Sequence, residues 1–109
     1  MINIDDFGKL ELRVGTIKKA ESFPEAKTSA YKLRIDFGPL GKKWSSAQIT
    51  ENYSLGDLVG HRVIAAMNLS NKVIGSFKSE VLVMGAEDNN GNIVLVEPDR
   101  NIENGSVVN

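Results

Sequence analysis

The chain has 109 residues, of which 41% are hydrophobic and none is cysteine. This length supplies one compact domain with a core but not two, so we expect a single domain over residues 1–109. His61 is the only histidine, and no Asp or Glu cluster has the spacing of a calcium loop. The usual combinations of nucleophile, acid and base are also missing. We therefore expect no metal, no cofactor, and a binding protein rather than an enzyme.

Charge is distributed unevenly along the sequence, although the formal net charge is only −1. Residues 1–78 contain 12 Lys and Arg against 8 Asp and Glu, whereas residues 79–109 contain 1 against 6. The two parts thus carry +4 and −5. Phosphate binding depends on locally placed cations, so a basic face that binds nucleic acid is compatible with this sequence.

The N-terminal residues lack the basic and apolar segments of a signal peptide. No apolar run approaches the roughly 20 residues that a membrane span requires. We expect a cytoplasmic protein without membrane insertion.

A short helix and a long strand are predicted at the start of the chain. Apolar residues recur at helical spacing over residues 4–10, after which side chains alternate from Leu12 to Phe23. We expect Gly15 to introduce a bend or a bulge into this strand.

Two further strands follow in the first half. Over residues 31–37 apolar side chains alternate with Lys32 and Arg34, which therefore share the solvent-facing side. Tyr31 lies on the same side of this strand as the apolar residues, so we expect it in the core. A Gly- and Pro-containing turn then leads into a third strand over residues 42–49.

The second half predicts more strands. Residues 63–67 and 81–86 read as strands, and the Asn90-Gly91 dipeptide predicts a hairpin between 81–86 and 93–96. With one helical turn expected over residues 51–60, the pattern is all-β. A small closed or partly open barrel, a sandwich and an SH3-like barrel all fit this periodicity.

Polar and basic residues gather in the link between the strands at 63–67 and 81–86. Asn68 follows one strand and Ser79 precedes the next, while Lys72 and Lys78 lie between them and offer charges to phosphates. The structural alternative is that the Asn caps a turn and the Ser satisfies a backbone group.

A second candidate is a basic patch on the predicted strands. Lys32 and Arg34 share one strand face, and the following turn brings Lys42 and Lys43 close to them. Trp44 adds a surface on which a base could stack, or else packs in the core. The structural alternative for the four cations is solvated surface charge.

Four segments of the chain resemble the tRNA-binding domain family: residues 12–17, 23–38, 45–50 and 62–85. Within the last segment, Asn68-Leu69, Ile74-Gly75 and Ser79 follow the N-L...K...G...S pattern of that family. This resemblance implies a small five-stranded OB-fold barrel with short helical elements and strand extensions.

The resemblance also implies where tRNA would dock. In the family, the groove beside the sheet uses the Asn and Ser that are here Asn68 and Ser79, with nearby basic residues. The family continues from this Ser as S-x-G-M, whereas here Glu80, Val81 and Leu82 follow. Val81 in place of Gly prevents a ligand from approaching the backbone closely, and Glu80 adds a negative charge beside the groove. This departure from the family pattern argues against tight tRNA binding. The predicted tRNA or ligand site comprises Lys32, Arg34, Lys42, Lys43, Asn68, Lys72, Lys78 and Ser79.

The segments at 45–50 and 77–83 resemble the CsaA branch of the family most. That branch implies a homodimeric, export-related chaperone that binds unfolded polypeptides or preproteins. The alternative is a free-standing tRNA-binding protein. Apolar residues near the chain start and in the inter-strand link are the predicted dimer or peptide-binding surface: Phe7, Leu10, Leu69, Val73, Ile74 and Phe77.

Overall fold

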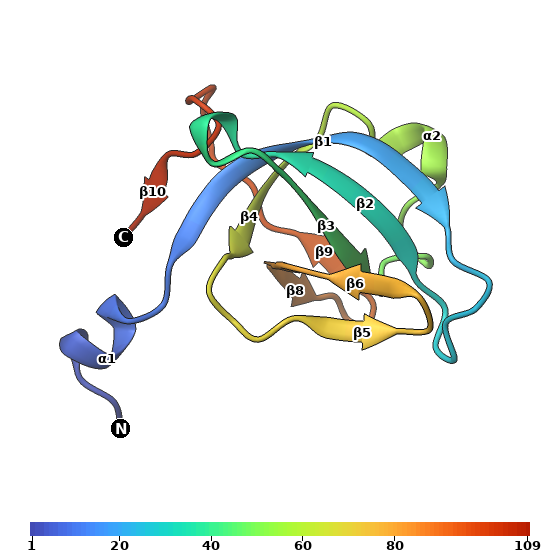
Figure 1. The fold of residues 1–109 in the computed structure, drawn as a ribbon, viewed down its shortest axis with the longest axis horizontal. Helices are drawn as coiled ribbons and strands as arrows, with labels where there is room; N and C mark the ends of the chain where they lie inside the picture. The colour runs from blue at the N-terminus through green and yellow to red at the C-terminus, as the bar shows by residue number, and fades with distance from the viewer.

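The computed structural model describes residues 1–109, and the chain forms an antiparallel barrel of strands with short helices at its ends (Figure 1). The helices are α1 (Ile4–Gly8), the 3-10 turn η1 (Gly38–Leu40) and α2 (Leu55–Leu58). The strands are β1 (Leu12–Ser22), β2 (Tyr31–Asp36), β3 (Lys42–Ala47), β4 (Arg62–Ala66), β5 (Lys72–Ile74), β6 (Phe77–Ser79), β7 (Leu82–Val83), β8 (Gly85–Glu87), β9 (Ile93–Leu95) and β10 (Val107–Val108). No helix is long and apolar enough to cross a membrane.

Five strands form the barrel wall in the order β3-β2-β1-β4-β7, and every neighbouring pair is antiparallel. The free side of β3 meets the segment between β6 and β7 at Trp44, whose carbonyl accepts hydrogen bonds from the N–H groups of Glu80 (2.8 Å) and Val81 (3.4 Å). These bonds nearly close the sheet, which protects its edges from other chains. The predicted all-β class and five-stranded OB-fold barrel are confirmed.

The core lies inside this barrel. Leu33, Ile35 and Phe37 from the predicted alternating strand are completely buried, together with Ile17 from β1. Tyr31 packs against the same cluster, and its hydroxyl donates to the Tyr53 carbonyl at 2.8 Å. The prediction that Tyr31 faces the core is therefore confirmed.

The bulge expected at Gly15 is not there. The register irregularity of β1 lies between Ile17 and Lys19 instead. A Cβ at Gly15 would lie 2.6 Å from Ile35 Cγ2 and 2.7 Å from Phe37 Cε1, distances that real side chains do not adopt. The glycine is needed because two core side chains fill the space beside its backbone.

The second half differs from the sequence prediction in two places. The strand expected over residues 81–86 is divided into β7 and β8, which belong to different sheets. The link assumed to be a polar loop contains the β5–β6 hairpin. In sequence, this hairpin is marked by the two-residue Gly75-Ser76 loop.

The predicted β8–β9 hairpin is present, but its turn is wider than a two-residue loop. Gly91 has a positive φ of 80°, and Asn90 does not. The turn is organised by Asp88, whose carboxylate accepts hydrogen bonds from the Asn52 side chain (3.0 Å) and the N–H groups of Asn90 (2.8 Å) and Asn92 (3.0 Å). The Asn52 bond, followed by the two backbone bonds, lowers the pKa of Asp88 from its ordinary value.

Candidate functional site

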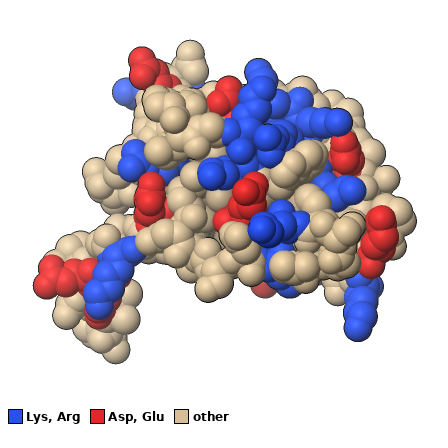
Figure 2. All heavy atoms as spheres, viewed as in Figure 1, with Lys and Arg blue, Asp and Glu red and all other residues tan.

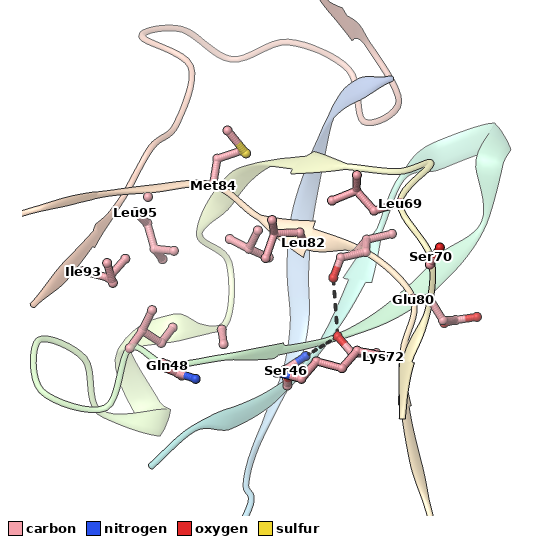
Figure 3. A pocket seen from close by; sticks show the side chains of 16 residues that line it. Ser46, Gln48, Leu69, Ser70, Lys72, Glu80, Leu82, Met84, Ile93 and Leu95 are labelled. Carbon is pink, nitrogen blue, oxygen red and sulfur yellow. Dashed lines mark hydrogen bonds between the residues drawn. The ribbon is translucent and has the colours of Figure 1, made fainter. Parts of the chain in front are cut away.

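An open hollow of about 530 Å³ lies where the end of β3, the loop before β5, β7 and the β8–β9 hairpin meet (Figure 3). We call it the apolar hollow because nine of its 16 lining residues are hydrophobic. Its lining residues are Ser46, Ala47, Gln48, Ile49, Leu69, Ser70, Lys72, Ser79, Glu80, Val81, Leu82, Val83, Met84, Gly85, Ile93 and Leu95.

Aliphatic side chains from separate elements surround the apolar hollow (Figure 3). Leu69 lies on one side, Ile93 and Leu95 on the other, and Leu82 between them. Leu69 and Leu82 retain 46% and 52% of their accessible surface. Large apolar groups that stay this exposed around a concave surface are typical of a binding site.

Ser79 lies at the floor of the apolar hollow but is used by the fold. The residue is only 8% exposed, and its Oγ accepts the Ser46 N–H at 2.9 Å. The neighbouring Glu80 also bonds to β3, because its Oε2 accepts the Trp44 N–H at 2.8 Å. Ser79, which the family pattern assigns to tRNA, and Glu80, which departs from that pattern, therefore both close the barrel seam. The Glu80 side chain, which was expected to oppose phosphate in the groove, is instead engaged with the β3 backbone.

Asn68 is likewise engaged within the chain. Its Oδ1 accepts the Glu11 N–H at 2.8 Å, and its Nδ2 donates to the Lys9 carbonyl at 2.7 Å. Beside it, the Met67 N–H donates to the Glu11 carbonyl at 2.8 Å. Asn68 thus fixes the segment that connects α1 to β1.

The basic patch lies on the outer face of β1, β2 and β3, where Lys and Arg side chains gather (Figure 2). Pairing aligns Lys19, Arg34 and Trp44 in one row across the three strands. The guanidinium of Arg34 lies 5.2 Å from the Trp44 ring centre, within the range of a cation–π contact. Lys19 was not predicted from the sequence, because it has the parity of the buried Ile17 and only the register shift between these two residues brings it beside Arg34 on the outer face.

Lys32 belongs to the same face but is held by neighbouring groups. Its Nζ lies 5.4 Å and 5.6 Å from the ring centres of Phe23 and Phe77, and 3.8 Å from Glu21 Oε1. Hydrogen bonding from Lys19, with smaller charge effects of Lys19 and Lys32, lowers the pKa of Glu21. Glu21 therefore remains a carboxylate and reduces the positive charge available to phosphates.

The remaining predicted cations are dispersed. In the β2–β3 register Lys42 lies opposite Asp36, on the outer face. Lys43 lies opposite the buried Ile35 and is therefore on the other face of β3. Lys72 borders the apolar hollow, and Lys78 is exposed on the opposite face of the β5–β6 hairpin. The structure does not bring the eight predicted ligand residues into one site.

The predicted apolar surface is also divided. Phe7 and Leu10 lie in and after α1, while Leu69 borders the apolar hollow. Val73 and Ile74 line a second hollow of about 380 Å³.

Phe77 packs within the chain, with its ring centre 5.1 Å from that of Phe23 and 5.8 Å from that of Trp44. Sequence reasoning missed Leu82, Ile93 and Leu95 as hollow-lining residues because their apolar runs were assigned to buried strands. No group of three or more His, Cys, Asp or Glu residues could hold a metal ion.

We predict that Ser79→Ala destabilises the fold by about 1–3 kcal/mol, since the Ser46 N–H loses its partner. Urea unfolding monitored by Trp44 fluorescence measures this change. Ser76→Ala is the matched control, because Ser76 is in the hairpin loop and its side chain has no hydrogen bond. Unchanged stability with a loss of tRNA binding would instead make Ser79 a ligand residue.

Comparisons with known proteins identify relatives that share this fold. Residues 12–107 match the family described as "Putative tRNA binding domain". The chaperone CsaA from Bacillus anthracis str. Ames is 46% identical and superposes with a TM-score of 0.94, covering 100% of this chain and 99% of that one. CsaA from Picrophilus torridus is 45% identical with a TM-score of 0.93, and the match covers 100% of both chains.

Methionine–tRNA ligases form a second group of relatives. The enzyme of Methanocaldococcus jannaschii is 36% identical over 107 residues, which are 98% of this chain and 16% of the ligase. That of Flavobacterium johnsoniae is 30% identical over 109 residues, which are 100% of this chain and 15% of the ligase. The chain thus spans about 15% of the length of these ligases. The match over residues 12–107 shows that the chain belongs to the tRNA-binding domain family, with CsaA chaperones among its structural neighbours.

Proposed function

We propose that the protein is a homodimeric chaperone that binds unfolded polypeptides, including preproteins before export, in the apolar hollow. The observation that carries this proposal is the half-exposed aliphatic lining contributed by Leu69 and Leu82. An unfolded chain exposes apolar side chains, and their burial in such a hollow is favourable. The likeness to two CsaA chaperones over the full chain supports the same function.

The charge around the apolar hollow favours polypeptide over nucleic acid. The lining contains one cation, Lys72, and one anion, Glu80. A tRNA groove requires several cations placed along a phosphate backbone. Ser79 and Asn68, which the family pattern assigns to tRNA, have their side-chain groups occupied by Ser46, Lys9 and Glu11.

Binding of tRNA is the second candidate function, and a separate surface favours it. On the outer face, Lys19, Lys32 and Arg34 lie beside the partly buried Trp44, with Glu21 among them. Cations next to an aromatic ring form a surface that can hold phosphates and stack bases. The two functions would therefore use different faces of the barrel.

The dimer part of the proposal rests on α1. This helix extends away from the barrel (Figure 1), and none of its residues is buried. Ile4 is 78% exposed and Phe7 also remains exposed, although both are apolar. A short helix with an uncovered apolar side is marginal in water, so packing on a second copy would stabilise it.

Binding to two probes tests the function. We expect reduced, carboxymethylated lactalbumin to bind with an affinity that persists from low to near-physiological salt, because apolar burial is not screened. Leu82→Glu should weaken this binding about tenfold or more, since it places a charge in the hollow. The matched control is Val59→Glu, an equally exposed position near α2. Fluorescence anisotropy with labelled lactalbumin and labelled tRNA measures both affinities.

The opposite pattern would favour the second candidate. Salt-sensitive tRNA binding without lactalbumin binding contradicts the chaperone proposal. In that case the double variant Lys32→Ala with Arg34→Ala should reduce the slope of log affinity against log salt by roughly one unit per lost phosphate contact. An unchanged slope would exclude these two residues from the tRNA site.

Sedimentation velocity tests the dimer. We expect a dimer at micromolar concentration, and a monomer for the double variant Ile4→Glu with Phe7→Glu, since charge replaces the uncovered apolar side of α1. Because these residues are exposed, circular dichroism should show an intact barrel. Val59→Glu is the control and should remain dimeric. A monomeric wild-type protein would refute the dimer.

A further inference from the structure

The β5–β6 hairpin leaves one backbone edge free. Its strands are joined by the two-residue Gly75-Ser76 loop, and Gly75 has a φ of 60°, as the first position of a type II′ turn requires. In such a hairpin the flanking pair, Ile74 and Phe77, exchanges both backbone hydrogen bonds. The next pair, Val73 and Lys78, is then not hydrogen-bonded. The N–H and C=O of Val73 therefore point away from β6.

No other strand covers this edge. β5 pairs with β6 alone, and Val73 is 65% exposed. The backbone hydrogen bonds outside regular strands include none from or to Val73. A free edge of this kind is a template for pairing with another extended chain.

The free edge faces a hollow rather than open solvent. Lys72, Val73 and Ile74 form one wall of the 380 Å³ hollow, and residues 25–30 contribute to its lining. In residues 25–30, the only backbone hydrogen bond outside the strands is Ala26 N–H to the Phe23 carbonyl, at 3.2 Å. The hollow thus has unpaired backbone groups on both sides, and its volume is in the range of ligand sites.

The two hollows adjoin each other. Ser46, Gln48 and Lys72 line both the 380 Å³ hollow and the apolar hollow. A chain that extends along β5 would therefore pass Lys72 and could place an apolar side chain against Leu69.

We propose that an unfolded polypeptide binds as an added β-strand on the free edge of β5, in the hollow beside residues 25–30. This inference rests on the proposed function and specifies how the client is held. Backbone pairing is independent of client sequence, while the adjoining apolar hollow supplies preference for an aliphatic side chain. RNA does not fit this edge, because it lacks the regular N–H and C=O pattern of a strand.

Two measurements test the proposal. Val73→Pro removes the free N–H at a position where an edge strand tolerates proline, and Val73→Thr is the control that retains it. With labelled, carboxymethylated lactalbumin, we expect about a tenfold loss of affinity for the proline variant and little change for the threonine variant. In the unaltered protein, saturating lactalbumin should slow hydrogen exchange of the Val73 amide, as followed by NMR. The second readout does not depend on the folding of a variant.

The outcomes separate this inference from the proposed function. If lactalbumin binds but Val73 exchange is unchanged and Val73→Pro binds normally, the added strand is refuted and the chaperone function stands. If the unaltered protein does not bind lactalbumin, both are refuted. If Val73→Pro changes the sedimentation of the protein alone, the edge is occupied by a second copy of this chain, and the inference is wrong.

Discussion

The seam between β3 and the segment after β6 is the constraint on which the rest of the structure depends. Both backbone polar groups of Trp44 are hydrogen-bonded to Glu80. The Trp44 N–H donates to the Glu80 carboxylate, and the Trp44 C=O accepts from the Glu80 N–H, both at 2.8 Å. Ser79 adds a third bond to Ser46 N–H. Without these bonds β3 would be an open edge and the barrel a curved sheet.

The seam also determines where the functional surfaces lie. It holds the β5–β6 hairpin beside β3, where Phe77 packs against Phe23 and Trp44 on the outer face. Lys72 and Ser79 lie on the same face of the hairpin as Phe77 and border the apolar hollow. One short hairpin therefore contributes both to the cluster of cations and aromatic rings and to the concave apolar surface beside it. The proposed polypeptide site therefore borders this hairpin and leaves the strand order of the barrel unchanged.

The sequence predicted the regular strands well because their side chains alternate over enough residues. β2 is the best example, since its buried Leu33 and Ile35 mark a register that a one-residue shift would destroy. Strands of two or three residues carry too little pattern, so β5, β6 and β10 were not predicted. The Gly75-Ser76 dipeptide was the available signal for the β5–β6 hairpin.

The candidate site was harder to predict, because the same residue types serve as ligands and as structural bonds. Asn68 and Ser79 have the chemistry of an RNA-binding pair, yet they bond to Lys9, Glu11 and Ser46, which are distant in sequence. Such long-range partners are not visible in local patterns. The apolar hollow was hard to predict for the same reason, since Leu82 lies in a run with the composition of a buried strand and only the three-dimensional arrangement leaves its side chain exposed.

The claim that polypeptide binds in the apolar hollow is tested most directly by a two-dimensional NMR titration of the labelled protein with unfolded, carboxymethylated lactalbumin. The account predicts that chemical shift changes concentrate at Leu69, Leu82 and Ile93. Changes confined to Lys19, Arg34 and the Trp44 indole on the outer face, with the hollow unaffected, would contradict it.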